Sequence, residues 1–348
     1  MSSRSILSSL IVFCAGALLC APALADTVIP PAGEKLLDQH HYHAAASFFD
    51  NYLQQHGSDA GGFLGRGLAN AHIGQQLSAM NDFTRSISLA PTARAYVARA
   101  HLLEIQRHKR LALLDYTQAM RLEPKKPEYS ALLGALYYEV HNWDKADEWY
   151  GKACALDPKN SSYWSERCRA AAKADDNLHA AEYARKAVSL SAKEYKSFEF
   201  LAKMATREEK YKEAIDYGLK GLAYNSEDED LLIYIAESYL ALKQPGTAVS
   251  FLSAQMKLPH KPSIRFRLCV LRAKAYYQFG KLELALQDYN FAIEKLMKPG
   301  DDVETYAERG LLLKKLGRLK EATADFDTAA RMSHEKINDY NADPLAKP

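Results

Sequence analysis

The 348-residue sequence predicts an all-α solenoid of about nine helix–turn–helix repeats, and two regularities predict it. The first is an alanine that recurs with steps of 34, 33, 34, 34, 34, 34, 37 and 37 residues. The second is a small residue that always lies twelve positions before that alanine. A period of this size indicates short units that bury their apolar faces against their neighbours. The alanines are Ala45, Ala79, Ala112, Ala146, Ala180, Ala214, Ala248, Ala285 and Ala322.

Each repeat is expected to consist of two antiparallel helices joined by a short turn. The small residue and the alanine let the two helices approach closely where they cross. Four positions after the alanine, six repeats carry an aromatic ring that would fill the wider gap where the helices diverge. Second helices are expected to end before Pro91, Pro124 and Pro158, because proline lacks the N–H group that continues a helix. The rings are Phe49, Phe83, Tyr116, Tyr150, Tyr289 and Phe326.

Three consecutive repeats between residues 161 and 262 depart from this pattern. Their aromatic residue lies one position earlier, and one residue rotates a helical side chain by about 100°. We therefore expect these rings to contact a different neighbour and the superhelical pitch to change locally. The shifted rings are Tyr183, Tyr217 and Phe251, and the positions that they vacate hold Ala184, Gly218 and Leu252.

Glycines mark the predicted turns between the two helices of several repeats. Gly74, Gly280 and Gly317 lie where first helices are expected to end, and glycine adopts the left-handed conformation of such turns at low cost. Asp175-Asp176-Asn177 and Pro245-Gly246 are expected to serve the same purpose in two other repeats.

Four glycines crowd the first helix of the second repeat, namely Gly61, Gly62, Gly65 and Gly67. They give this helix the lowest predicted stability in the chain, because glycine loses more backbone entropy than other residues. The cluster superficially resembles a phosphate-binding loop, but no strand precedes it and no lysine-serine pair follows it. A structural role is therefore favoured over phosphate binding.

The whole pattern resembles the tetratricopeptide repeat, whose period of 34 residues and order of small and aromatic residues it shares. The resemblance extends over nearly all of the chain after the first 25 residues and implies a right-handed superhelical α-solenoid. It also implies that the first helices line the concave side and that the protein is a binding scaffold. The repeat most similar to the family runs from Glu128 to Pro158 and matches it at Leu133, Gly134, Tyr137, Ala146, Tyr150, Ala153 and Pro158.

The amino terminus has the features of a secretory signal peptide. Arg4 precedes an apolar stretch over residues 6–19, and Ala23-Leu24-Ala25 offers a cleavage site of small residues. The apolar stretch is too short for a membrane-spanning helix. Cys20 suggests a lipoprotein, but Leu19 stands where lipoprotein processing requires a small residue. We therefore expect cleavage after Ala25 and a periplasmic or secreted protein.

The chain is thus expected to contain a signal peptide at 1–25, one repeat solenoid at 26–337 and a polar tail at 338–348. A repeat array can reach this length without splitting into domains, because each repeat adds its own slice of core. The repeats are expected to occupy approximately residues 26–59, 60–92, 93–126, 127–160, 161–194, 195–228, 229–262, 266–299 and 303–336.

Composition and motifs give no indication of catalysis, of a cofactor or of nucleic-acid binding. Without the signal peptide the chain holds 44 Lys and Arg against 43 Asp and Glu, so it lacks the basic excess typical of nucleic-acid-binding proteins. It contains no catalytic serine elbow and no zinc-protease motif, so no enzyme is expected. His40, His41 and His43 could hold a metal ion, and Cys154 and Cys168 could form a disulfide. The sequence decides neither question, and we assign no metal site.

Cationic residues are predicted to line the concave groove in the fifth and sixth repeats. Two like-charged pairs four residues apart, Arg169 with Lys173 and Lys203 with Arg207, weaken their helices slightly, and an acidic ligand would explain them. Tyrosines in the fourth and eighth repeats are predicted to anchor the same ligand. The alternative is an ordinary charged face screened by nearby carboxylates. The predicted partner-binding residues are Arg169, Lys173, Lys196, Lys203, Arg207, Tyr138 and Tyr277.

Two functions fit these features, and neither requires a cofactor, nucleic acid or a transmembrane segment after signal removal. The favoured one is a non-enzymatic protein–protein interaction scaffold that binds an extended peptide or a partner helix in its concave groove. Its partner is a protein or peptide, for which an acidic segment is one option. The alternative is a carrier or assembly factor for an exported anionic polymer such as a polysaccharide, because cations bind acidic groups and tyrosines stack on sugars.

Overall fold

A computed structural model describes residues 28–296 and 303–342 of the chain. Those residues form eighteen α-helices, one short π-helical turn and no strand, so the predicted all-α array of helix–turn–helix repeats is confirmed. The helices fall into two compact units, the first ending at Asp176 and the second beginning at Asn177. The predicted signal peptide and its cleavage site lie outside the described residues.

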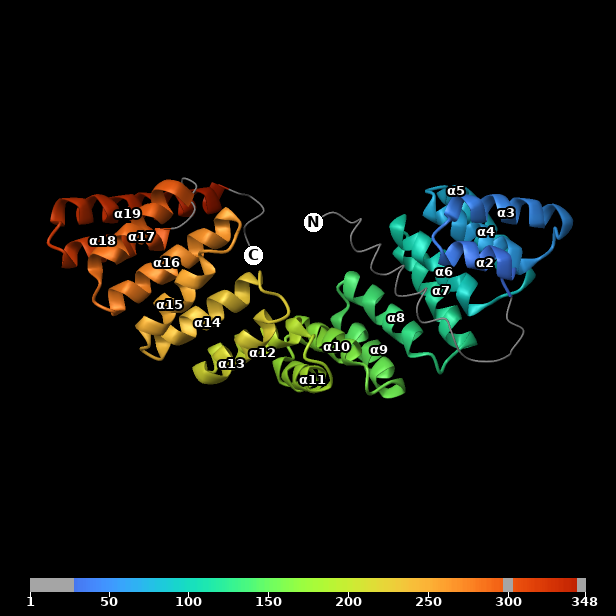
Figure 1. The fold of residues 1–348 in the computed structure, drawn as a ribbon, viewed down its shortest axis with the longest axis horizontal. Helices are drawn as coiled ribbons and strands as arrows, with labels where there is room; N and C mark the ends of the chain where they lie inside the picture. Colours follow the sequence, from blue (N-terminus) through green and yellow to red (C-terminus); the bar gives the residue numbers. More distant parts are fainter. Residues whose placement is uncertain (1–27, 297–302, 343–348) are drawn as a thin grey trace. The chain divides into compact units, whose positions relative to one another are not determined.

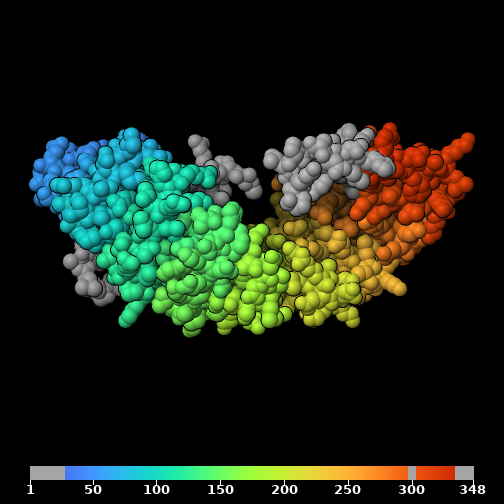
Figure 2. All heavy atoms as spheres, turned by 180° about the vertical axis from the view of Figure 1, so that it is seen from behind, coloured from blue at the N-terminus to red at the C-terminus, as the bar shows by residue number. Residues whose placement is uncertain are grey.

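The first unit holds repeats 1 to 4 and the first helix of repeat 5. Its consecutive helices pack side by side in chain order, each roughly antiparallel to the one before it (Figure 1). Successive repeats of a unit form neighbouring bands of atoms in the space-filling view (Figure 2). The helices are α2 (Pro31–Asp38), α3 (Tyr42–Gln55), α4 (Ala60–His72), α5 (Gln76–Leu89), α6 (Ala93–Ile105), α7 (Lys109–Leu122), α8 (Pro127–Glu139), α9 (Trp143–Leu156) and α10 (Ser161–Lys173).

The second unit holds the second helix of repeat 5 and repeats 6 to 9. Its last helix continues to Ala342 and so includes the first part of the segment expected to be a polar tail. The remaining residues of that tail, 343–348, lie outside the described residues. The helices are α11 (Asn177–Leu190), α12 (Tyr195–Arg207), α13 (Tyr211–Leu222), α14 (Glu229–Ala241), α15 (Pro245–Gln255), α16 (Pro262–Gln278), α17 (Leu282–Phe291) with the π-helical turn η1 (Ala292–Leu296), α18 (Val303–Lys315) and α19 (Leu319–Ala342).

The recurring alanines form the centre of each repeat, and all nine have at most 2% of their surface exposed. The small residue of the first helix faces the ring of the same repeat. A Cβ atom on Gly67 would lie 2.7 Å from the ring of Phe83, and one on Gly310 would lie 2.7 Å from the ring of Phe326. A larger side chain would displace the ring from a close-packed core, so the predicted close approach of the two helices is confirmed.

In repeat 6 the ring is missing from its usual place, and a side chain of the next repeat fills the space. Gly218 stands where most repeats carry the ring, and a Cβ atom there would lie 2.5 Å from Cγ1 of Ile235 on α14. The ring of Tyr217, one residue earlier, lies instead near Phe198 of α12, with the ring centroids 6.4 Å apart. The predicted change of neighbour is therefore confirmed for this repeat.

A residue in the left-handed conformation lies in the turn between the two helices of all nine repeats. Gly74, Gly280 and Gly317 adopt it as predicted, with φ values of 85°, 79° and 77°. The other six repeats use a non-glycine residue with φ between 56° and 64°, which costs about 1–2 kcal/mol per residue. The prediction for Pro245-Gly246 was wrong, because these residues begin α15 and Lys243 makes the turn. The six residues are His40, Arg107, His141, Asp175, Glu209 and Lys243.

The glycine-rich helix α4 is an element of close packing. A Cβ atom on Gly61 would lie 2.2 Å from the carbonyl oxygen of Val28, and one on Gly65 would lie 2.2 Å from the ring of Phe49. One ion pair also joins the first helices on the two sides of α4. Nη1 of Arg94 on α6 donates to Oε1 of Glu34 on α2 at 2.8 Å. The glycines thus lower the helix propensity of α4 and allow close packing against Val28 and the rings of Phe49 and Phe83.

Four repeats carry a feature that we call an arginine clasp. In each clasp an arginine on the first helix donates from Nε and Nη2 to both carboxylate oxygens of an aspartate on the second helix, at 2.6–3.0 Å. Its Nη1 donates to a side-chain oxygen on the second helix of the preceding repeat, at 2.9–3.4 Å. The clasps are Arg66–Asp82, Arg99–Asp115, Arg272–Asp288 and Arg309–Asp325, in repeats 2, 3, 8 and 9.

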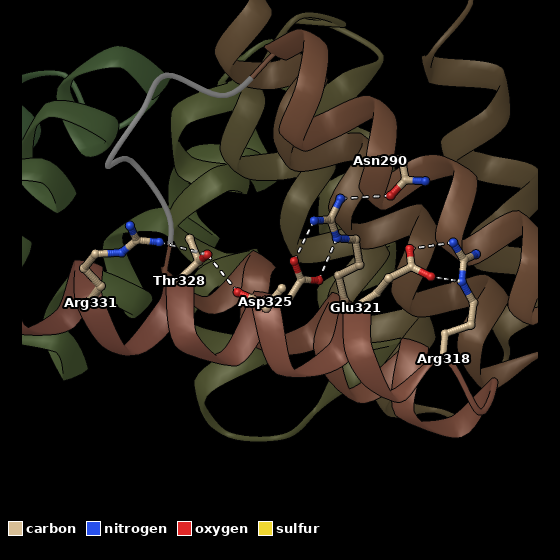
Figure 3. Close-up of polar contacts among 8 residues, drawn as sticks. Asn290, Arg318, Glu321, Asp325, Thr328 and Arg331 are labelled. Carbon is tan, nitrogen blue, oxygen red and sulfur yellow. Dashed lines mark hydrogen bonds and ion pairs between the residues drawn. The ribbon is translucent and has the colours of Figure 1, made fainter.

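Figure 3 shows the clasp of repeat 9, in which dashed lines join Asp325 and Asn290 to one guanidinium group, that of Arg309. The side chain of Asp325 is only 7% exposed, so this is a largely buried, bidentate ion pair. Each clasp therefore joins three helices from two consecutive repeats. Arg318 and Glu321 form a second pair in the same view, but it lies in solvent.

Candidate partner-binding faces

The first part of the candidate site lies on α8 and α10 in the first unit. The guanidinium of Arg169 lies 4.8 Å from the centre of the Tyr138 ring, so two of the predicted residues come together. Nη1 of Arg169 also donates to both carboxylate oxygens of Glu166, at 2.8 and 2.6 Å. Trp143 packs edge-on against Tyr138, with the ring centroids 4.9 Å apart. Arg169 is therefore held by its own chain, and a ligand carboxylate would have to compete with Glu166.

A buried tyrosine, Tyr150, and a glutamate of the next repeat, Glu166, accompany the half-buried Tyr138. Burial, and then the charge of Glu166, raise the pKa of the Tyr150 hydroxyl, so this group stays protonated at neutral pH. Tyr289 holds the same position 139 residues later, and its hydroxyl donates to Oε2 of Glu308 at 3.2 Å. Burial also raises the pKa of Tyr289. The tyrosine–glutamate pair thus occurs once in each unit.

Tyr277, the second predicted anchor, lies on α16 in the second unit. Nζ of Lys315 on α18 lies 4.4 Å from the centre of its ring, and the residue is 36% exposed. Next to it, Nζ of Lys274 on α16 forms an ion pair with Oε1 of Glu308 on α18 at 2.7 Å. Both predicted tyrosines therefore lie under a cation of the following first helix, although the sequence named only one of these cations.

The other predicted cations are more accessible. Lys196 and Arg207 are exposed on α12, Lys203 is half-buried on the same helix, and none of the three has an ion-pair partner among the described residues. Lys173 is exposed at the end of α10, in the first unit. The seven predicted residues are divided between the two units, so their placement along one common groove stays a prediction.

Carboxylates lie beside the cations of α12. Burial raises the pKa of the Glu199 carboxyl, and the charges of Asp228 and Asp230 raise it further, against the opposing effect of two lysines. Burial, with Asp230 and Glu199 acting in the same direction, raises the pKa of Tyr234 to about 12. The neighbourhood of α12 therefore contains half-buried carboxyl groups as well as cations, whereas the stripe predicted from the sequence was mainly cationic, with Glu199 as its one acidic member.

The sequence reasoning missed the carboxylates of α14. Asp230 and Glu237 follow Lys196 and Lys203 by 34 residues, so they occupy the same positions in the next repeat. A comparison of equivalent positions across repeats could have found them. We define the first-helix face of the second unit as Lys196 and Lys203 on α12, Asp230 and Glu237 on α14, Arg267 and Lys274 on α16, and Glu304 and Glu308 on α18.

The structure shows what surrounds the histidines and cysteines for which the sequence left a metal site or a disulfide undecided. No group of three or more His, Cys, Asp or Glu residues in the described part of the chain could hold a metal ion. A hydrogen bond of 2.7 Å links Nδ1 of His40 to the hydroxyl of Tyr42, whose ring stacks on His72. Cys154 and Cys168 are free and buried, and burial raises their pKa to about 12. Across residues 28–296 and 303–342 no helix has the length and apolar character needed to cross a bilayer.

Comparisons with known proteins agree with this architecture. The model of the tetratricopeptide repeat family matches residues 303–334. Tetratricopeptide repeat protein 6 of Homo sapiens is 28% identical over 98 residues, which are 28% of this chain and 19% of that protein. Bacteriophage adsorption protein A of Escherichia coli (strain K12) is 42% identical over 74 residues, which are 21% of this chain and 7% of that protein. The matched part of the chain thus spans less than a fifth of either relative.

A solved structure has the same fold. It is the C-terminal part of a TPR repeat-containing protein from Cytophaga hutchinsonii, with a TM-score of 0.58 and 16% sequence identity. The superposition covers 66% of this chain and 94% of that one. At this identity the likeness concerns the stacking of helix pairs and not a ligand.

Proposed function

Because the chain is a tetratricopeptide repeat protein, we propose that it is a scaffold that binds an extended segment of a partner protein along its first helices. The observation that carries this proposal is the first-helix face of the second unit. Its charges include Lys196, Lys203 and Asp230, which have no ion-pair partner among the described residues and are available to a ligand. Successive first helices offer such charges at regular intervals, which suits a segment that runs across them.

We also propose that the protein works in the periplasm or outside the cell. The support is the sequence of the first 25 residues, in which a cation, an apolar stretch over residues 6–19 and a small-residue tripeptide follow in the order of a signal peptide. Fractionation of cells that express the full chain, with amino-terminal sequencing of the product, tests this. A product that starts at Asp26 and leaves the cytoplasm supports the proposal, and an unprocessed cytoplasmic product contradicts it.

The alternative, a carrier for an anionic polymer, is less well supported by the charges of the face. A polyanion that crosses α12, α14 and α16 would meet Asp230 and Glu237 between two sets of cations, and like charges at an interface are unfavourable. A cation already lies over one face of each predicted tyrosine, Arg169 over Tyr138 and Lys315 over Tyr277, so a sugar could stack only on the other face. A protein partner that presents both signs of charge avoids these conflicts.

Crosslinking in intact cells tests the scaffold directly. We expect the wild-type chain to capture a defined protein and the variant Lys203→Glu with Arg207→Glu to lose it. The matched control is Lys186→Glu with Lys212→Glu, which makes the same change of charge at exposed positions on the second helices α11 and α13. Capture that survives the first variant, or that the control abolishes equally, contradicts binding on the first helices.

A further inference from the structure

The charge on the first-helix face of the second unit changes sign from each first helix to the next. At one position the four repeats carry Lys196, Asp230, Arg267 and Glu304, and all four side chains are exposed. Seven residues further along each helix, the first three repeats repeat the order with a lysine, a glutamate and a lysine. Helix α12 is therefore positive, α14 negative and α16 positive along both rows, and α18 is negative in the first row, whereas its second-row position holds Leu311.

Some of these charges interact with one another, and others have no ion-pair partner in the described part of the chain. Lys274 and Glu308 form an ion pair between α16 and α18 at 2.7 Å. On α12 and α14, by contrast, Lys196, Lys203 and Asp230 have no ion-pair partner among residues 28–296 and 303–333. The alternation therefore remains open to a ligand at its α12 and α14 positions.

The half-buried carboxyl of Glu199 lies near Lys196 and Lys203, whose charges lower its pKa, but this effect is smaller than the opposing effect of burial and two aspartates. Glu199 of α12 forms no ion pair with any described residue, and burial together with Asp228 and Asp230 raises its pKa. Tyr234 of α14 lies within electrostatic range of Glu199 and Asp230. A cationic side chain of a ligand at α14 would offset the repulsion among these groups and could also contact the tyrosine ring.

Resting on the proposed function, we infer that the segment bound on this face is an extended peptide whose charge alternates in step with the helices. It is acidic opposite α12, basic opposite α14 and acidic opposite α16. The repeat length follows from helix packing: α14 packs against both α12 and α16, and packed helices lie about 8–10 Å apart. An extended chain advances about 3.3 Å per residue, so each sign occupies roughly three residues.

Labelled nine-residue peptides test this on the full-length protein by fluorescence anisotropy at low salt. The probe has three glutamates, three lysines and three glutamates in that order. A peptide of the same composition with scrambled order and a peptide of nine glutamates serve as comparisons. We expect the ordered peptide to bind about ten-fold more tightly than the scrambled one, and added salt to weaken all three.

Reversal of the two acidic charges on α14 provides a second test of the inference. In the variant Asp230→Lys with Glu237→Lys, the face becomes positive across three helices, and we expect the nine-glutamate peptide to bind most tightly. The matched control is Glu213→Lys with Asp216→Lys on the second helix α13, for which we expect the wild-type ranking.

Two results would overturn the inference: nine glutamates binding the wild-type chain at least as tightly as the ordered peptide, or the ordered and scrambled peptides binding equally. In the second case the alternation serves only to attract neighbouring helices. Neither result contradicts the proposed scaffold function, because the crosslinking experiment tests that function separately. In that experiment, loss of the captured protein on charge reversal of α12 is read independently of any peptide.

Discussion

Repeats 8 and 9 and repeats 6 and 7 join their two helices at the same positions by different chemistry. In repeats 8 and 9 an arginine one residue before the small position binds an aspartate three residues after the alanine. In repeats 6 and 7 these positions hold apolar and aromatic residues, and Leu201 and Ile235 are at most 2% exposed. The shifted aromatic ring, Tyr217 or Phe251, stands where the clasp has its aspartate. These rings lie near aromatic residues of their own first helices, Tyr217 near Phe198 at 6.4 Å and Phe251 near Tyr239 at 6.2 Å between ring centroids. The shift thus replaces the ion pair of a clasp by an aromatic contact.

Repeat 5 is intermediate between the two kinds. Arg167 occupies the arginine position of a clasp, but Tyr183 stands in place of the aspartate. Nε of Arg167 donates to Asp147 on α9 at 2.9 Å, so the contact with the preceding repeat is kept. The comparison teaches that an arginine at the clasp position can bind a carboxylate of the preceding repeat when its own repeat carries no aspartate.

Removal of one member of a clasp should have the largest effect. In the variant Arg309→Ala the largely buried carboxylate of Asp325 loses its bidentate partner, and we expect a loss of about 3 kcal/mol in the unfolding free energy of repeat 9. Hydrogen exchange of amides in α18 and α19 measures it. The control Arg318→Ala breaks an exposed pair in the same repeat, and we expect little change. Equal losses of unfolding free energy in the two variants would show that a clasp contributes no more to stability than an exposed ion pair does.

A second variant tests whether the residues of repeat 7 can replace the clasp of repeat 9. In the double variant Arg309→Ile with Asp325→Phe, repeat 9 receives the residues that repeat 7 carries at these positions. Replacement of a buried ion pair by apolar residues is often close to neutral, so we expect at least half of the stability lost in Arg309→Ala to return. No recovery would mean that the two chemistries are not interchangeable.

The vacated ring position in repeat 6 should tolerate no added atom. In Gly218→Ala the new Cβ would meet Cγ1 of the buried Ile235 at 2.5 Å, and we expect a loss of about 1–3 kcal/mol from overpacking. Gly246→Ala is the matched control, because its Cβ would lie 3.8 Å from the ring of Phe279, an ordinary contact. We expect the control to be neutral or slightly stabilising in thermal unfolding. A neutral Gly218→Ala would contradict the tight fit.

The turns of repeats 7 and 8 offer a smaller contrast. Lys243 and Gly280 occupy equivalent positions with φ values of 56° and 79°. We expect Lys243→Gly to raise stability by about 0.5–1 kcal/mol, because glycine relieves the left-handed strain at some cost in chain entropy. Gly280→Ala should have the opposite sign and lower the unfolding midpoint. The same sign for both would show that backbone strain does not govern these turns.

Titration of Glu199 should give the smallest effect. Its pKa is raised in the folded state, so its ionised form costs stability once the pH exceeds the folded pKa, and the cost vanishes below the unfolded pKa. Glu199→Gln should therefore be more stable than the wild type at pH 7 and indistinguishable from it near pH 3. The control Glu148→Gln has the opposite sign, because a hydrogen bond from Lys152 lowers the pKa of Glu148. Unfolding midpoints at the two pH values measure both.

The fold was predictable because each repeat obeys the same steric rule. A small residue must face a ring, and Gly67 and Gly310 do so with no room for a methyl group. The turns were predictable where they contain glycine or the run Asp175-Asp176-Asn177, in which Asp175 adopts a φ of 61°. At Arg107 or Lys243 the side chain has no preference for the left-handed conformation, and the surrounding helices impose it.

The candidate site was predictable only in part. The cations of α12 stand out within a single helix, but the sign of a face depends on which helices are neighbours. Asp230 and Glu237 became part of the site only when α14 was placed beside α12. The clasps were missed for a related reason, because a separation of 16 residues between arginine and aspartate acquires meaning only across two packed helices.

The ion pair between Arg94 and Glu34 links two repeats that are not consecutive. Linear repeat arrays are usually described by the stability of each unit plus a term for each adjacent pair, so that unfolding can advance from an end one unit at a time. A bridge across α4 adds a term between first and third members of the series. The side chains of this pair are 31% and 36% exposed, so it should contribute at most about 1 kcal/mol. Loss of the amino-terminal pair of helices should therefore lower the stability of the third repeat slightly, although that repeat is two units away.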